Sequence, residues 1–231
     1  MLSSKTVPVV VACLLLPLAP ALLADSLNDG LIAHWPLNAV QGETLKDLGP
    51  GKHDALAEEV KLVEGRGDRV MAFDGVKSKI LLPDDPAFEI KGDYGVSFWV
   101  RVEPETESSG PIYTQPGFSI KVFKGGIRVT FQHPEYGRTG YADLMGPKLN
   151  DGSWRHVVFS YKGKTGLGEL FVDAQEVGAA SFTHKPEAGG PTTVGHSGRF
   201  HFRGELSDLR VYSRPLELED VGELNNAKIE P

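Results

Sequence analysis

Apolar and polar residues alternate at every second position through most of the chain, and this period of two predicts β-strands. In residues 94–103, Val96, Phe98 and Val100 share one face, while Trp99 lies on the other. Strands of this kind bury one face against a second layer, so the pattern predicts an all-β sandwich of two sheets. The expected strands cover residues 31–37, 52–57, 69–74, 78–83, 94–103, 111–115, 118–124, 127–132, 154–162, 168–173, 176–182, 191–195 and 203–212.

Turn signals and one helical segment complete the outline. Asp74-Gly75 and Asp151-Gly152 are typical of tight turns, and residues 163–168 form a glycine-rich connection between two predicted strands. A period of 3.6 outside the first residues appears only at 216–224, directly after Pro215, and predicts one short C-terminal helix. Neither a repeat nor an interdomain linker interrupts the pattern, so residues 25–231 are expected to form one domain.

The alternation slips by one residue in the last predicted strand. Leu206 holds one parity, whereas Leu209 and Val211 hold the other. One extra residue at Ser207-Asp208 accounts for the slip, so we expect a β-bulge there. Such a bulge turns the Asp208 carboxylate out of the regular alternation.

Residues 1–24 have the pattern of a secretory signal peptide. Lys5 precedes an apolar run, and Ala24 is a small residue before the acidic Asp25. Prolines interrupt the run and no basic cluster follows it, which argues against a transmembrane anchor. We therefore expect a secreted or periplasmic protein with no membrane span after cleavage.

Cys13 is the only cysteine in the sequence. Residues 10–13 imitate a lipoprotein cleavage box, but the apolar run continues past Cys13 instead of turning polar. Lipid anchoring at Cys13 is therefore not expected. After cleavage at Ala24 the domain has no cysteine, so its stability does not depend on disulfides.

The charge of the chain argues against two classes of partner. The sequence has 24 Lys and Arg against 31 Asp and Glu, a net charge of −7 that becomes −8 when Lys5 leaves with the signal peptide. Nucleic acids and anionic membranes are bound through basic surfaces. We therefore expect neither as a partner, and mild acidity otherwise indicates only solubility.

Six short motifs follow one another in order along residues 30–221. They are GLIAHWPLN at 30–38, DLGPGKHDALA at 47–57, RVMAFDGVKSKILLPD at 69–84, YGVSFWVRV at 94–102, WRHVVFSYKGKTGLGELFVDAQEVG at 154–178 and FRGELSDLRVYSRPLELEDV at 202–221. Together they resemble the laminin-G-like (LamG-like) domains of the concanavalin A-like lectin/glucanase superfamily. The resemblance implies a jelly-roll sandwich, an architecture that hosts lectins, glycanases, lyases and adhesive modules.

The catalytic signatures of hydrolases are missing from the sequence. A retaining glycanase needs two carboxylates on one strand face, about 5–5.5 Å apart. Glu169 and Asp173 share parity, but Phe171 stands between them and Asp173 is expected to be a turn residue. Residues 195–198 lack the second glycine and the following helix of a nucleophile elbow. We expect a non-catalytic protein.

A polysaccharide lyase is the enzymatic alternative. Alginate-lyase relatives of the fold use arginine, glutamine, histidine and tyrosine on one sheet. These residue types occur together in this chain at Gln132, His133, Tyr136, Arg138 and Tyr141. Pro134 and nearby glycines predict that this segment is a loop instead of a catalytic strand.

Aromatic rings and planar polar groups in two loop-like stretches predict a carbohydrate-binding surface. Ring faces pack on the C–H patches of sugars while polar groups take the hydroxyls. Loops held by a rigid scaffold commonly carry such residues. The candidate ligand-binding residues are Tyr113, Gln115, Tyr136, Arg138 and Tyr141 in the first stretch and His196, Arg199 and His201 in the second.

Asp208 is also the candidate ligand of a structural calcium ion. Its place in the closing strand resembles an aspartate that binds calcium in related glucanases, with backbone carbonyls as the other ligands. By this resemblance the remaining donors lie near Asp74 and Gly75 and near His34. Oxygen donors suit calcium, whereas zinc requires clustered histidines or thiolates. The alternative is that Asp208 accepts hydrogen bonds from backbone amides.

The sequence thus leaves three classes of function. The preferred one is a secreted, non-catalytic LamG-like module that binds a carbohydrate or another extracytoplasmic partner. The others are a polysaccharide-active lyase or glycoside hydrolase on the same jelly roll and a structural or adhesive subunit. Trp99 and Trp154 are expected to be buried in the sandwich core.

Overall fold

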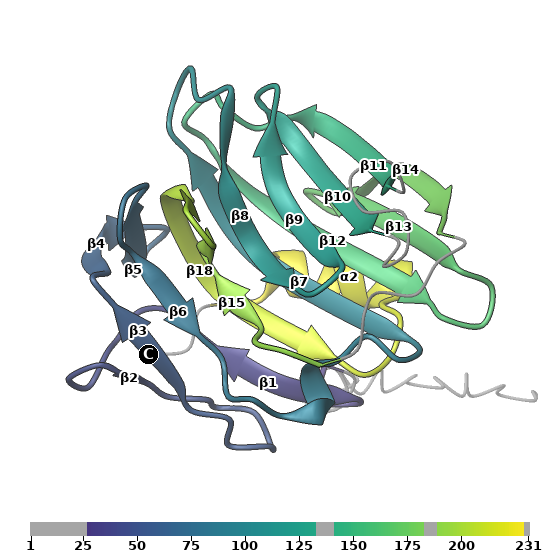
Figure 1. Ribbon diagram of the computed structural model, residues 1–231, viewed down its shortest axis with the longest axis horizontal. Helices are drawn as coiled ribbons and strands as arrows, with labels where there is room; N and C mark the ends of the chain where they lie inside the picture. The colour runs from purple at the N-terminus through teal and green to yellow at the C-terminus, as the bar shows by residue number, and fades with distance from the viewer. Residues whose placement is uncertain (1–26, 133–140, 183–188, 229–231) are drawn as a thin grey trace, which may run out of the picture.

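Two antiparallel sheets stacked face to face make up the protein, as the computed structural model in Figure 1 shows for residues 27–132, 141–182 and 189–228. The all-β sandwich with one short C-terminal helix is therefore confirmed. The first sheet has the order β14 (Gln175–Ser181), β13 (Leu167–Val172), β12 (Trp154–Lys162), β7 (Tyr94–Val102), β18 (Arg203–Tyr212), β5 (Asp68–Asp74) and β4 (Lys61–Gly65), with β1 (Leu31–Trp35) also paired to β18.

The second sheet runs over the first and carries the short strands of the chain. Its order is β11 (Tyr141–Lys148), β10 (Gly126–Gln132), β9 (Phe118–Phe123), β8 (Ser108–Gln115), β15 (Thr193–Val194), β6 (Lys79–Leu81), β3 (Ala55–Glu58) and β2 (Thr44–Leu45). A separate two-stranded hairpin consists of β16 (His196–Ser197) and β17 (Phe200–His201), and the helical elements are η1 (Pro86–Phe88) and α2 (Leu218–Asn226).

The core lies between the sheets and is filled by the inward faces of the alternating strands. Phe159 of β12 contacts Phe118 of β9 and Phe131 of β10, with ring centroids 5.5 and 6.0 Å apart. Tyr94 of β7 and Tyr113 of β8 join the two sheets through a 2.5 Å hydrogen bond between their hydroxyl groups. Burial raises the pKa of both phenols, so the pair stays neutral.

The predicted bulge in β18 is confirmed. Ser207 pairs with Trp99 and Arg210 pairs with Ser97, so β18 holds one residue more than β7 in this interval. Asp208 takes up the irregularity with a φ of 53°. The slip lets Leu206 and Leu209 both face the core despite their opposite parity.

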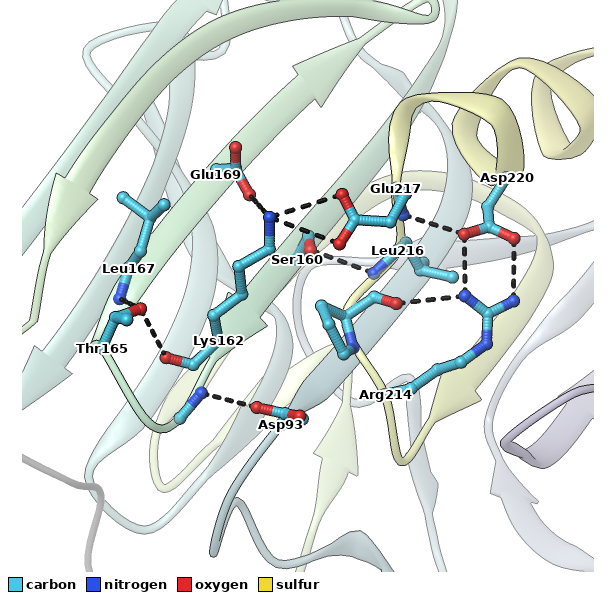
Figure 2. A network of polar contacts seen from close by, with 12 residues as sticks. Asp93, Ser160, Lys162, Thr165, Leu167, Glu169, Arg214, Leu216, Glu217 and Asp220 are labelled. Carbon is cyan, nitrogen blue, oxygen red and sulfur yellow. Dashed lines mark hydrogen bonds and ion pairs between the residues drawn. The ribbon is translucent and has the colours of Figure 1, made fainter.

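Helix α2 covers the outward face of the first sheet. Leu216, Val221 and Leu224 pack against Val158 and Phe171 of that face. Figure 2 shows the polar contacts around this packing: Arg214 donates to both carboxylate oxygens of Asp220 at 2.7 and 2.8 Å, and Lys162 approaches Glu169 and Glu217 at 3.2 and 3.3 Å. The helix begins two residues later than the sequence predicts. Among the described residues, no helix has the length and apolar character needed to cross a membrane.

Trp99 and Trp154 are not core residues, so this prediction is wrong. Both are half-buried on the outward face of the first sheet, because they share parity with Ser97 and His156 and not with Phe98. The Arg66 guanidinium lies 3.5 Å from the Trp99 ring centroid and covers that ring. Strands β2, β4 and β11 and the β16–β17 hairpin were not predicted.

Candidate ligand-binding cleft

A cleft of about 980 Å³ lies on the outward side of the second sheet. Its floor comes from β8, β9 and β10, and the β16–β17 hairpin forms one wall. Alternation in β9 buries Ile120 and Val122 and leaves Ser119 and Lys121 on the outward face. The side chains with hydrogen-bonding groups in the lining are Ser108, Ser109, Thr114, Gln115, Ser119, Lys121, Thr130, Gln132, Thr193, His196, Ser197, Arg199 and His201.

The hairpin is seated on β8 because Gly110 has no side chain. A Cβ atom at Gly110 would lie 2.4–2.6 Å from backbone atoms of His201, a distance that real atoms do not tolerate. The Gly195 amide donates to the Ile112 carbonyl at 2.9 Å, and the Phe202 amide donates to the Gly195 carbonyl at 2.8 Å. These bonds fix the wall relative to the floor.

The rings of the two hairpin histidines contact each other at a tilt of 52°, with ring centroids 4.8 Å apart. His196 donates from Nε2 to the Gly198 carbonyl at 2.7 Å. The Nδ1 atoms of His196 and His201 and the Nε2 atom of Gln115 are buried. None of the three has a hydrogen-bond partner among the described residues. Buried polar atoms normally bind a partner, so these three atoms are exceptions at the cleft.

Phe200 forms an apolar platform at the tip of the hairpin. Its side chain is 58% exposed, one of the largest exposures of an aromatic residue in the described structure. The Arg199 guanidinium lies 5.3 Å from the Phe200 ring centroid. The pair offers a ring face next to a planar donor, which is an arrangement that suits sugar binding.

Lys121 supplies a positive charge to the floor of the cleft. It lies on β9 between Pro111 of β8 and Arg128 of β10. Burial, together with the positive charge of Arg128, lowers the pKa of Lys121, and Asp143 opposes the shift. Asp143 pairs with Arg128 and accepts a 3.0 Å hydrogen bond from Thr130, so both its oxygens are engaged.

Four of the predicted ligand-binding residues meet in this cleft: Gln115, His196, Arg199 and His201 all line it. Tyr113 does not, because it is fully buried and bonded to Tyr94, so its assignment as a ligand-binding residue is corrected. Tyr136 and Arg138 lie outside the described residues. Tyr141 begins β11 instead of lying in a loop, and its side chain also lies outside the description.

The cleft also contains residues that the sequence did not single out. Lys121, Thr130 and Phe200 belong to it. The outward parity of Lys121 between Ile120 and Val122 was a usable signal, but only the structure shows that this face is hollowed. Gln132, proposed for a lyase, lines the cleft, whereas His133 lies outside the described residues.

The residues assigned to calcium lie at two separate places in the fold, and calcium binding stays a prediction. His34 and Asp208 do meet, but through a 2.7 Å contact between His34 Nε2 and Asp208 Oδ1, the same oxygen that accepts from Arg210 Nε at 3.1 Å. A guanidinium beside the carboxylate opposes a bound cation. The Asp74 carboxylate accepts from the amides of Val76, Lys77 and Ser78 beside the Gly75 turn.

Asp74 also lies far from Asp208 along the closing strand, since it pairs with Arg203. Among the described residues no group of three or more acidic, histidine or cysteine side chains could hold a metal. Backbone amides, the alternative to calcium, are not the described partners of Asp208, because its Oδ1 contacts the side chains of His34 and Arg210. Burial raises the pKa of Asp208, but the His34 hydrogen bond and the Arg210 charge more than offset it, and the pKa is lowered overall.

The carboxylates considered for hydrolysis are engaged elsewhere. Asp173 is the first residue of the two-residue β13–β14 turn, with a φ of 51°, which confirms its predicted place. It accepts from the His156 amide at 2.9 Å. Glu169 lies on the first sheet and contacts Lys162 at 3.2 Å. Neither residue lines the cleft.

Fold and cleft together define a lectin-like jelly-roll domain, and the family comparison agrees. Residues 74–222 match a laminin-G family described as the concanavalin A-like lectin/glucanases superfamily. This match covers more than half of the chain. The protein therefore belongs to that superfamily, as its motifs predicted.

Individual relatives are distant and longer than this chain. Neuronal pentraxin-2 of Cavia porcellus is 27% identical over 93 residues, which cover 35% of this chain and 22% of that protein. The binding domain of Paraclostridial Mosquitocidal Protein 1 superposes with a TM-score of 0.71 at 17% identity, over 87% of this chain and 52% of that chain. The botulinum neurotoxin serotype D ligand-binding domain, solved in complex with N-acetylneuraminic acid, gives 0.71 at 14% identity, over 88% and 52%. The chain spans about half the length of these solved chains, and the likeness establishes the fold alone.

Proposed function

We propose that the protein is a secreted, non-catalytic module that binds carbohydrate in the cleft of the second sheet. The cleft itself is the observation that carries the proposal. Its volume of about 980 Å³ falls in the range of small-ligand sites, which is about 300–1,000 Å³. It combines an exposed ring, Phe200, with the Gln115 amide and the His196 and His201 imidazoles, each of which has one nitrogen without a partner among the described residues.

The comparisons support a glycan as the ligand class. One structural neighbour was solved with N-acetylneuraminic acid, and another is botulinum neurotoxin type C, whose cell entry depends upon interaction with two ganglioside molecules. The pattern of residues 1–24 supports secretion. The composition of the lining supports a non-catalytic role, because no aspartate or glutamate from the described residues lines the cleft. Glycosidases need such acids as proton donor and nucleophile or base.

A glycan array probed with the purified protein tests the proposal, followed by calorimetry on the best ligand. Phe200→Ala should weaken binding about fivefold or more, because it removes the ring platform. Leu218→Ala is the matched control, since Leu218 is a similarly exposed apolar residue at 64% but lies on α2. Failure to bind any glycan, or equal losses in both variants, would contradict the proposal.

Catalysis is tested on the same polysaccharides. Reducing ends and unsaturated uronates should both stay at background after long incubation. Glu169→Gln and Gln132→Ala serve as diagnostic variants for hydrolysis and elimination. Turnover that survives repurification and disappears in either variant would show that the protein is an enzyme.

A further inference from the structure

We infer that the cleft selects acidic over neutral glycans and binds their carboxylate or sulfate groups through Lys121 and Arg199. This inference rests on the proposed carbohydrate-binding function and specifies its ligand class. It starts from the distribution of charge. The chain has 31 Asp and Glu, more than its 24 Lys and Arg, yet the described lining of the cleft contains Lys121 and Arg199 and no acidic residue.

Lys121 is the first half of the argument. The two other half-buried lysines among the described residues have carboxylate partners: Lys79 with Glu58 at 2.9 Å, and Lys162 with Glu169 at 3.2 Å. Lys121 has no ion pair or hydrogen bond with any described residue, although it is half-buried. A desolvated cation without a counter-charge is unfavourable. An anionic group of a ligand would supply the missing counter-charge.

Asp143 is the carboxylate whose charge acts on Lys121, but it does not neutralise Lys121. It lies on β11 opposite Thr130, one strand beyond the floor of the cleft. Arg128 engages one of its oxygens and Thr130 the other. The local group of Lys121, Arg128 and Asp143 therefore keeps one excess positive charge.

Arg199 provides a second cation on the wall. It lies at the turn of the β16–β17 hairpin over Phe200, and its guanidinium has no carboxylate partner among the described residues. Guanidinium groups bind carboxylates and sulfates in a bidentate manner. Lys121 on the floor and Arg199 on the wall therefore define two anion-binding positions, as an acidic oligosaccharide with charges on separate sugar units requires.

The experiment compares glycans that differ only in charge. Oligogalacturonate is measured against its carboxyl-reduced form, and dextran sulfate against dextran, by calorimetry on the purified protein. We expect binding of one or both anionic members only. The two pairs distinguish carboxylate from sulfate. Raising the salt from about 0.1 M to about 1 M should weaken this binding, because the screening length falls from about 10 Å to about 3 Å.

Lys121→Gln and Arg199→Gln should each weaken binding of the anionic glycan about tenfold. Lys61→Gln is the control, because it removes the same charge from an exposed position on β4 of the first sheet. Equal affinity for the neutral members would overturn the charge selectivity while leaving carbohydrate binding in place. Anionic binding that neither cleft variant weakens, or no binding to any of the four glycans, would also overturn it.

Discussion

The outward faces of the two sheets use charge in different ways. On the first sheet, Asp208 is paired with Arg210 and Asp220 with Arg214, whereas Arg66 lies over the Trp99 ring and has no ion pair with a described residue. On the second sheet, Lys121 and Arg199 face a cleft without a described counter-charge. Charge pairs satisfied within the fold fix one conformation, whereas an unpaired charge at a cleft remains able to bind a ligand.

Helix α2 gives the outward face of the first sheet a structural role. Its residues Val221 and Leu224 cover Val158 and Phe171 together with Leu216, which precedes the helix. The Leu216 amide donates to the Ser160 hydroxyl at 3.0 Å, as Figure 2 shows, and joins this segment to the sheet. Among the described residues, the β16–β17 hairpin forms one wall of the cleft over the floor from β8, β9 and β10. Substitutions on the first face should therefore affect stability, and substitutions in the cleft should affect binding.

The largest expected effect is that of Asp208→Ala. The substitution leaves Arg210, whose side chain is 9% exposed, without its counter-ion. Breaking a buried pair in this way costs about 3–5 kcal/mol of unfolding free energy. Urea denaturation measures the loss. The exposed Asp84, which forms no ion pair with described residues, provides the control Asp84→Ala.

The same measurement with and without a chelator tests the predicted calcium ion. Since Oδ1 of Asp208 already contacts His34 and the Arg210 guanidinium, we expect the wild-type melting temperature to be unchanged by chelation. A loss below about 1 kcal/mol in Asp208→Ala would contradict the structural role of the pair. If the chelator lowered the melting temperature of the wild type but not that of Asp208→Ala, the protein would bind calcium at Asp208.

A smaller effect is expected from the pH dependence of His156. Burial lowers its pKa from 6.5 to about 4, with Asp208 and Asp173 opposing the shift and Arg66 and Arg210 adding to it. Because the folded pKa lies below the unfolded one, the neutral ring favours the folded state at pH above 6.5. This stability declines as the pH falls from 6.5 towards 4, by an amount on the order of 3 kcal/mol.

Urea denaturation of the wild type and His156→Gln at several pH values between 7 and 4 isolates this contribution. Glutamine stays neutral, so the variant should show a flatter decline over that window. A wild-type curve parallel to that of the variant would show that His156 accepts its proton in the folded protein.

The sequence predicted the fold well because strand parity is a local signal. It located most strands, the Ser207-Asp208 bulge and the helix. It did not predict β11, because Gly146 and Pro147 are unfavourable in a strand. The strand forms through its pairing with β10. It also assigned Tyr113 to a binding loop, although β8 places this ring in the core.

The cleft was predicted only in part, because its walls come from segments far apart in the chain. The His196 to His201 hairpin reaches β8 through the missing side chain of Gly110, a contact that no local pattern encodes. The meeting of His34 with Asp208, 174 residues apart, was expected, but the chemistry of the contact was not. The Asp208 carboxylate contacts Arg210, and the direction of the Arg210 side chain follows from the bulge.

The smallest expected effects on the unfolding free energy are those of substitutions in the cleft. Lys121→Gln and Phe200→Ala should each change the unfolding free energy by no more than about 0.5 kcal/mol, since neither side chain is paired or buried in the core. Phe98→Ala, which empties a position that is 1% exposed between the sheets, should cost about 3–5 kcal/mol in the same urea assay. Lys121→Gln can even stabilise the protein, because it removes a half-buried charge that has no described partner. If it instead cost more than about 1.5 kcal/mol, the protein itself would hold this ammonium group, and the cation on the floor of the cleft would be structural like those of the first sheet.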